Sequence, residues 1–450
     1  MNIKIIFTGL AGGLLTLATA VYGQQPTGNS VPLVTAPDPT ASVEDSGADA
    51  FKLQGSAIEV SRDVTRQNAV LAPYEISGTG IGGARGSTQT ILTAPLPERG
   101  APFRTEGGVF IYPSIAVGYG YNDNVLNSGI NKLGSGLINV APQVMAEMKR
   151  RGDRYTAMLA VSRTDYSNSS NDNYSHYEAW VAGDNYFSAR ARAGWAFGQI
   201  NTTDPRGSNL RATSALPDRW HAPTLRGTFI YGAPEASGRI EVDVDARNKR
   251  YNNNPASTTI AEFNERSLAG RFFYRLGSRS LALVEASERV FDYTSAASPS
   301  DNTDRRLYLG YTWDASAATT GIVKIGRMSK RFTLASHEQF SGGTWTATVR
   351  WLPLTYSKVE FSLVKVAEDP NGFGSYLLNT NNSASWKHQW STSFSTTAAA
   401  SLNKTKYGGT SRSDDIQGIS LGINYNLRRW LTADSSLKCK SAWPRAKNWS

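Results

Sequence analysis

Seven arginines are the residues whose type and spacing could do chemistry in this chain. They lie in or beside segments where apolar and polar residues alternate, on the polar side of the alternation. A planar guanidinium group can hold a carboxylate, sulfate or phosphate through two parallel hydrogen bonds, so a row of them could pass an acidic polymer. The alternative is pairing with acids across the lumen, which would stiffen the wall, and we favour it because most of these charges have an opposite partner nearby. The seven are Arg190, Arg192, Arg226, Arg247, Arg271, Arg275 and Arg350.

The other reactive residue types form no recognisable catalytic or metal site in the sequence. His176, His221, His337 and His388 lie in different segments with no repeated offset, and no His-x-x-x-His motif is present. The single cysteine, Cys439, excludes a thiolate cluster and an internal disulfide. We therefore predict no enzymatic activity, no catalytic residue, no metal and no cofactor, although a glycosidase-type pair of carboxylates stays open.

The elements that position the arginines are predicted to be strands. Between residues 109 and 427 a stretch of alternating residues followed by a turn recurs about sixteen times. In residues 239–247, for example, Ile240, Val242 and Val244 fall on one face and charged residues fall on the other. Apolar residues at helical spacing are absent there, and a mean hydropathy of -0.37 excludes a bundle of membrane helices.

Strands with one apolar and one polar face suit a wall between lipid and water. We predict an all-β fold, an antiparallel transmembrane β-barrel of about 16 to 18 strands. Short turns, such as 150–153, alternate with long polar connections, such as 201–219 and 369–382. Short turns of such barrels face the periplasm, and the first connection (122–136) is long, so the chain is expected to enter from the periplasmic side.

The two ends of the chain differ from this pattern. Residues 1–23 are predicted to be a cleaved signal peptide, and residues 24–106, rich in Pro, Thr, Ser, Ala and Gly, a disordered periplasmic leader. The barrel is assigned to residues 107–430. Residues 431–450 are basic and interrupted by Pro444, so we expect an atypical, truncated C-terminal segment and a barrel that closes at about sixteen strands or closes poorly.

The net charge of +10 does not indicate a nucleic-acid-binding protein, because the 47 basic residues are scattered along the chain without a recognition module. Cations inside a pore or at a rim facing lipopolysaccharide explain the excess of basic over acidic residues equally well.

Three stretches carry a resemblance to a known family: ERGAP at 98–102, GGVFIYPSI at 107–115 and YNDNV at 121–125. Together with the strand rhythm over most of residues 98–430, they resemble the opening of the putative beta-barrel porin type 2 family, whose members are often associated with exopolysaccharide biosynthesis. The last motif is interpreted as an Asx turn at a strand end, with a cation or sugar site as the alternative.

The resemblance implies a porin-like barrel in the cell outer membrane that takes part in exopolysaccharide or capsule export or assembly as a passive conduit or scaffold. Its expected partners are outer-membrane lipid and lipopolysaccharide, the outer-membrane assembly machinery, a polysaccharide and periplasmic export proteins. Two alternatives remain: a general diffusion porin for small solutes, and a secreted β-sandwich adhesin or polysaccharide lyase outside the membrane.

Overall fold

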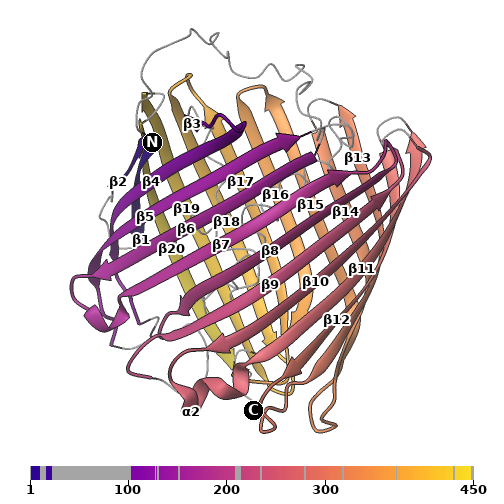
Figure 1. Ribbon diagram of the computed structural model, residues 1–450. Coiled ribbons are helices and arrows are strands. Elements are labelled where there is room, and N and C mark those ends of the chain that lie inside the picture. The colour runs from indigo at the N-terminus through magenta and orange to yellow at the C-terminus, as the bar shows by residue number, and fades with distance from the viewer. Residues whose placement is uncertain are drawn as a thin grey trace.

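A single sheet, antiparallel from β3 to β20 and rolled into a barrel, makes up the described part of the protein (Figure 1). The computed structural model describes residues 2–10, 17–22, 103–126, 128, 131–150, 153–207, 214–233, 236–277, 280–316, 319–370, 372–428 and 431–446 of the 450-residue chain. The predicted leader lies outside the described residues as far as residue 102. None of the helices in these ranges is long and apolar enough to span a membrane.

Eighteen strands, β3 to β20, follow one another in the described part of the chain, and each pairs antiparallel with the next. The short first strand is β3 (Phe103–Arg104). The first half of the wall comprises β4 (Val109–Asn122), β5 (Ser135–Arg150), β6 (Asp153–Tyr166), β7 (Tyr174–Tyr186), β8 (Ala191–Asp204), β9 (Asp218–Tyr231), β10 (Gly238–Tyr251), β11 (Phe263–Gly277) and β12 (Ser280–Tyr293). The second half comprises β13 (Asn302–Ser316), β14 (Thr319–Phe332), β15 (Phe340–Leu354), β16 (Ser357–Glu368), β17 (Leu377–Gln389), β18 (Phe394–Tyr407), β19 (Arg412–Arg428) and β20 (Leu431–Ala446).

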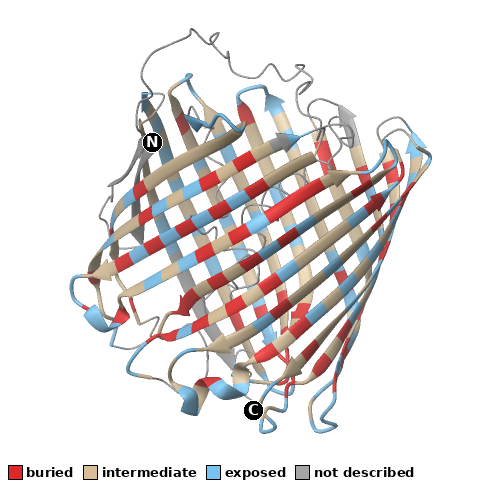
Figure 2. Ribbon diagram, in the orientation of Figure 1, coloured by how far each residue is buried: buried red, intermediate tan, exposed pale blue. Residues whose placement is uncertain are grey.

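The alternation of residue types follows the two faces of this wall, as the bands of colour along the strands show (Figure 2). In β10, Ile240 and Val244 are 49% and 46% exposed, whereas Glu241 and Arg247 between and beyond them are 0% and 4% exposed. The apolar rows therefore lie on the outside, where lipid can cover them, and the charged rows point inward. A β-sandwich would bury the apolar rows between two sheets, so the alternative of a secreted sandwich protein is wrong.

The connections alternate between short and long, as predicted. One end of the barrel carries the connections 151–152, 187–190, 278–279, 317–318 and 429–430. The opposite end, at the bottom of Figure 1, carries the longer connections, including 205–217 and the segment that holds α2 (Pro255–Thr258) and η3 (Thr259–Ala261). We call the first end periplasmic and the second extracellular, in line with the rule for such barrels.

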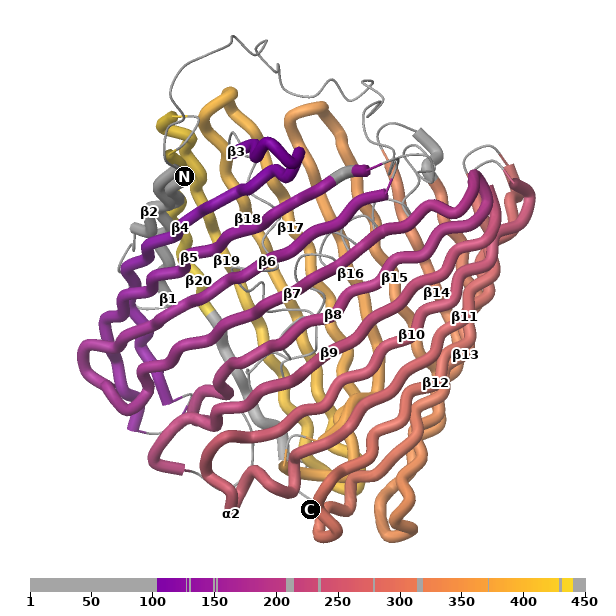
Figure 3. The backbone as a smooth tube through the Cα atoms, viewed as in Figure 1, coloured from indigo at the N-terminus to yellow at the C-terminus, as the bar shows by residue number. Residues whose placement is uncertain are grey.

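The barrel closes through the N-terminal segment. Strand β1 (Asn2–Leu10) lies between β4 and β20 and pairs in parallel with both, Ile5 being opposite Val117 on one side and Ala433 on the other. Strand β2 (Leu17–Tyr22) pairs antiparallel with β4 at the same seam. The tube drawing shows the tilt of the strands from β4 to β20 around the barrel (Figure 3). That residues 1–23 are a cleaved signal peptide stays a prediction.

Two boundaries differ from the sequence-based expectation. Strand β20 continues the wall past residue 430 to Ala446, because the predicted C-terminal segment pairs with β19 from Leu431↔Arg428 to Ala446↔Arg412. Strand β17 begins at Leu377, inside the connection predicted at 369–382. The Asx turn of the YNDNV motif is confirmed, since the backbone N–H of Asn124 donates to Oδ1 of Asn122 at 2.9 Å.

An apolar cluster occupies part of the inner face. Met145, Met158, Trp180, Ile200 and Trp220, from β5 to β9, are each at most 4% exposed. The ring of Trp180 lies flat over Gly198 of the next strand, where a Cβ atom would come within 2.1 Å of the ring. The lumen is therefore not uniformly polar, and this side of it is lined by rings and thioethers.

Candidate functional site

The inner wall of the barrel is the candidate functional site, because a porin-like barrel acts through its lumen. Six of the seven predicted arginines lie on inward-facing positions of β8, β9, β10, β11 and β15. Arg190 does not: it lies in the 187–190 turn at the periplasmic end and is exposed. Arg275 lies near the periplasmic end of β11, and its Nε donates to the carbonyl oxygen of Ala236 at 3.5 Å.

Four of the inward arginines each lie beside a carboxylate on the same strand or a neighbouring one. The pairs are Arg192 with Asp184 at 3.0 Å, Arg226 with Asp245 at 3.0 Å, Arg247 with Glu265 at 2.5 Å and Arg350 with Glu360 at 3.8 Å. The partners belong to one wall rather than to opposite walls of the lumen. The positive charge of this face is therefore largely balanced where it arises.

Arg271 is the centre of the most extensive ion-pair network. Its guanidinium group contacts Glu285 at 2.8 Å on β12, and Asp243 and Glu241 (3.8 Å) on β10. Glu285 also accepts from Lys324 of β14 at 3.1 Å. A guanidinium group held by three carboxylates cannot turn to an anionic solute without leaving them unpaired, so the wall of β8 to β14 is suited to stiffness rather than to anion capture.

The wall of β15 to β18 has a different chemistry. One register row carries four hydroxyl groups side by side on the inner face: Thr348 of β15 is opposite Ser362, Ser362 is opposite Ser383, and Ser383 is opposite Ser401. We call these four the hydroxyl row. None is buried, and none makes a side-chain hydrogen bond within the described ranges, so all four hydroxyl groups are open to whatever fills the lumen.

Amide groups extend this neutral surface. Asn381 and Asn403 are opposite each other in the next row towards the extracellular end, and Ser385 lies in the next row towards the periplasm. The nearest charges in that last row, Arg350 and Glu360, are paired. A strip of uncharged hydrogen-bonding groups therefore lies on the inside of the barrel, next to the ion-paired wall that ends at β14.

The hydroxyl row was not predicted from the sequence. The run Asn379 to Ser385 has the composition of a polar loop, and part of it was assigned to the 369–382 connection. Its outward residues include Thr380 and Asn382, so the apolar half of the alternation is weak there. The clean alternation of β19 could have located the row. It fixes which residues of the paired strand β18 face inward, and through β18 those of β17.

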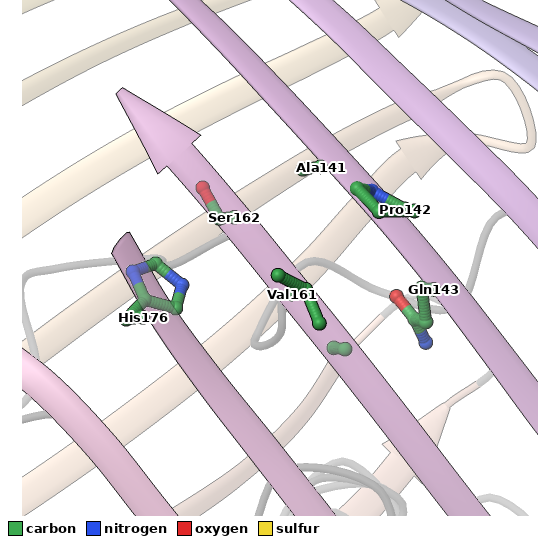
Figure 4. A pocket seen from close by; sticks show the side chains of 7 residues that line it. Ala141, Pro142, Gln143, Val161, Ser162 and His176 are labelled. Atoms are coloured by element: carbon green, nitrogen blue, oxygen red, sulfur yellow. The ribbon is translucent and has the colours of Figure 1, made fainter. Parts of the chain in front are cut away.

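A small hollow lies where Pro142 interrupts the ladder between β5 and β6 (Figure 4). Ser162 and His176 are opposite each other there, on β6 and β7. The hydroxyl oxygen of Ser162 accepts a hydrogen bond from Nδ2 of Asn139 at 2.8 Å, and His176 stacks on Tyr174 with ring centroids 6.4 Å apart. Within the described part of the chain, no three His, Cys, Asp or Glu residues are grouped so as to hold a metal.

Comparison with solved structures finds outer-membrane proteins. The FrpB iron transporter of Neisseria meningitidis is 11% identical with a TM-score of 0.43, and the similarity covers 69% of this chain and 61% of that one. OccK2 of Pseudomonas aeruginosa is 9% identical (TM-score 0.41, 75% and 98% covered), and a bacterial polysaccharide outer-membrane secretin is 10% identical (TM-score 0.35, 66% and 90% covered). A search of curated proteins found no match.

The family description is more specific. The profile described as putative beta-barrel porin 2 matches residues 104–448, which include all the long strands from β4 to β20. The chain therefore belongs to the putative beta-barrel porin 2 family.

Proposed function

We propose that this barrel lies in the outer membrane and serves there as a passive conduit or scaffold for an exported polysaccharide. The hydroxyl row is the observation that carries the polysaccharide part of the proposal. Each sugar unit of a glycan presents several hydroxyl groups, which donate and accept hydrogen bonds as serine and threonine do. A row of unpartnered hydroxyls can hold such a chain by many exchangeable contacts of low energy.

The charge distribution supports an uncharged or weakly charged glycan. The lumen arginines that would hold an acidic polymer already lie against carboxylates, with Arg271 contacting three. Exchanging those partners for a passing acid would leave buried carboxylates unpaired, which costs several kcal/mol per charge. The proposal includes no chemical step, and its partners are periplasmic export proteins that deliver the chain to the lumen.

Replacing the hydroxyl row tests this function. We expect a variant with Thr348→Val, Ser362→Ala, Ser383→Ala and Ser401→Ala to bind neutral glucan oligomers about thirtyfold more weakly or worse, since each of the four lost hydrogen bonds is worth about 0.5 to 1.5 kcal/mol. The measurement is the blocking of single-channel current by dextran oligomers in planar bilayers. Ion conductance should stay unchanged, because the substitutions alter no charge and little volume.

A matched control replaces four hydroxyls of the outer face, at Thr303, Ser329, Ser341 and Thr380. Equal blocking by dextran in the row variant and the control would contradict the polysaccharide part of the proposal but not the barrel fold.

A general diffusion porin is the second candidate function, favoured by the exposed Ser383 and Thr397 of the inner wall. Rapid liposome swelling with small sugars, without dextran blocking, would support it.

A further inference from the structure

The outer face of the barrel concentrates its exposed cations at one end, although Arg150 of β5 also points outward at the other end. Eight exposed arginines and lysines point outward within about six residues of the extracellular end of their strands. They are distributed around the wall from β6 to β18, and we call them the outer cation belt. The members are Arg163, Arg219, Arg266, Arg305, Arg327, Arg331, Lys404 and Lys406.

Part of the belt has no acidic partner. Arg163, Arg266 and Arg305 lie beside Asp165, Asp292 and Glu288, all on the outer face. The side chains of Arg327 and Arg331 on β14, and of Lys404 and Lys406 on β18, make no ion pair with any residue in the described ranges. With Arg219, five belt cations therefore project from the surface that faces the membrane without an ion pair in the described ranges, and of these Lys404 has Asp415 opposite it in the register.

The register of β13 and β14 brings three arginines of the belt together. Arg305 is opposite Ser329 in the register of β13 and β14, so it lies diagonally between Arg327 and Arg331. Diagonal neighbours on one face of a sheet are about 7 to 8 Å apart, within reach of long side chains. Three guanidinium groups can therefore converge on one anionic group from two strands.

The surface below this group is apolar. Leu307 and Leu309 on β13 and Ile325 on β14 follow on the same outer face towards the middle of the wall, and they are 55%, 61% and 62% exposed. A ligand that satisfies both surfaces has an anionic head and hydrocarbon chains. Free phosphate or a soluble acidic peptide would use only the cations.

The periplasmic end of the outer face is different. Few cations accompany the aromatic rings there: Trp195, Tyr231, Tyr274, Trp351, Trp386 and Tyr425 are outward and at least 38% exposed, as are Tyr119, Tyr177 and Trp345 near the extracellular end. Aromatic rings suit the interface of an ordinary phospholipid leaflet. The two ends thus differ in the lipid headgroup that they fit. An outward arginine must reach such a headgroup, because facing hydrocarbon at the bilayer midplane would destabilise the barrel by up to about 2 to 4 kcal/mol.

From this asymmetry we propose that the outer cation belt binds the phosphate groups of an acylated, phosphorylated glycolipid in the outer leaflet, with Arg305, Arg327 and Arg331 forming one site. The guanidinium fork matches a phosphate oxygen pair. The acyl chains lie along Leu307, Leu309 and Ile325. The inference concerns the outside of the barrel and is independent of what passes through the lumen.

Removing the unpaired cations tests the site. In detergent, the purified barrel is titrated with a bisphosphorylated, hexa-acylated glucosamine disaccharide, and binding is followed by native mass spectrometry. We expect a variant with Arg327→Gln, Arg331→Gln, Lys404→Gln and Lys406→Gln to bind about tenfold more weakly, because each exposed charge pair is worth about 0.2 to 1 kcal/mol. No acid loses a partner in this variant, so the barrel should fold.

A matched control removes four exposed cations at the periplasmic end, by replacing Arg150, Arg190, Lys387 and Arg428 with glutamine. It should bind the glycolipid as the native protein does. Removing the phosphates from the ligand gives a second measurement on the native protein alone, and it should weaken binding by a similar factor. Unchanged affinity in the belt variant, or equally tight binding of phosphatidylglycerol or of the dephosphorylated ligand, would overturn the proposal.

Discussion

Replacing Arg271 with glutamine is expected to lower the free energy of unfolding of the barrel by about 3 kcal/mol. The substitution leaves Asp243, Glu241 and Glu285 without their shared cation, and Glu241 is 0% exposed. The expected cost is at the lower end of the range for breaking a buried ion pair, because 24% of the Arg271 side chain is accessible and Lys324 still contacts Glu285. The measurement is the guanidinium-induced unfolding midpoint in detergent.

The exposed Arg190 supplies the matched control, since Arg190→Gln removes the same charge from a turn at the periplasmic end. Its midpoint should equal that of the native protein. In the Arg271→Gln background, adding Asp243→Asn should restore part of the loss, because that uncompensated charge is then gone, whereas Glu241 still contacts Arg239 at 3.2 Å. A loss below about 1 kcal/mol would indicate that the lumen network is hydrated like a surface ion pair.

Replacing Gly326 with valine is expected to destabilise the barrel by about 2 to 5 kcal/mol, the sum of overpacking and a lost buried hydrogen bond. The phenol of Tyr308 on β13 crosses Gly326 of β14 and hydrogen-bonds to the hydroxyl of Thr344 on β15, with the oxygens 2.9 Å apart. A Cβ at residue 326 would lie 1.9 Å from the carbonyl oxygen of Leu307, which is backbone and cannot move away.

Gly343 on the neighbouring strand is the control for that substitution. A Cβ added there meets nothing within 4 Å, so Gly343→Val should be tolerated. Heat modifiability on gels reports both variants: the fraction that migrates as a folded barrel should fall at a lower temperature for Gly326→Val only. Equal melting of the two variants would contradict the assigned close contact between β13 and β14.

The architecture was predictable because a membrane wall imposes a simple rule on every strand. Residues such as Ile240 and Val244 must be apolar towards lipid, and their neighbours Glu241 and Asp243 must be polar towards water, so the alternation appears in the sequence itself. The same rule placed six of the seven lumen arginines on the correct face. Arg190 was misplaced because it lies in the turn between β7 and β8, four residues beyond Tyr186, where the alternation no longer constrains direction.

The partners of the arginines and the hydroxyl row were less predictable. Which acid meets Arg271 depends on the register between β10, β11 and β12, and a shift by two residues would keep the pattern while changing every pair. The row from Thr348 to Ser401 depends on the register of four strands, and the composition near Asn379 is typical of a loop. Likewise, β20 has a polar, proline-containing sequence that only its pairing with β19 identifies as wall.

The other conclusions depend on one claim: the apolar rows of the strands face outward and the polar rows face inward. Cysteine labelling at two adjacent residues of β17 tests it directly, in a Cys439→Ser background that removes the native thiol. Intact barrels in lipid vesicles are treated with a charged maleimide. The variant Ser383→Cys should be labelled rapidly, because residue 383 lines the lumen, whereas Ala384→Cys should react only after the lipid is removed. Equal labelling of both, or labelling of Ala384→Cys alone, would contradict the assigned faces of the barrel.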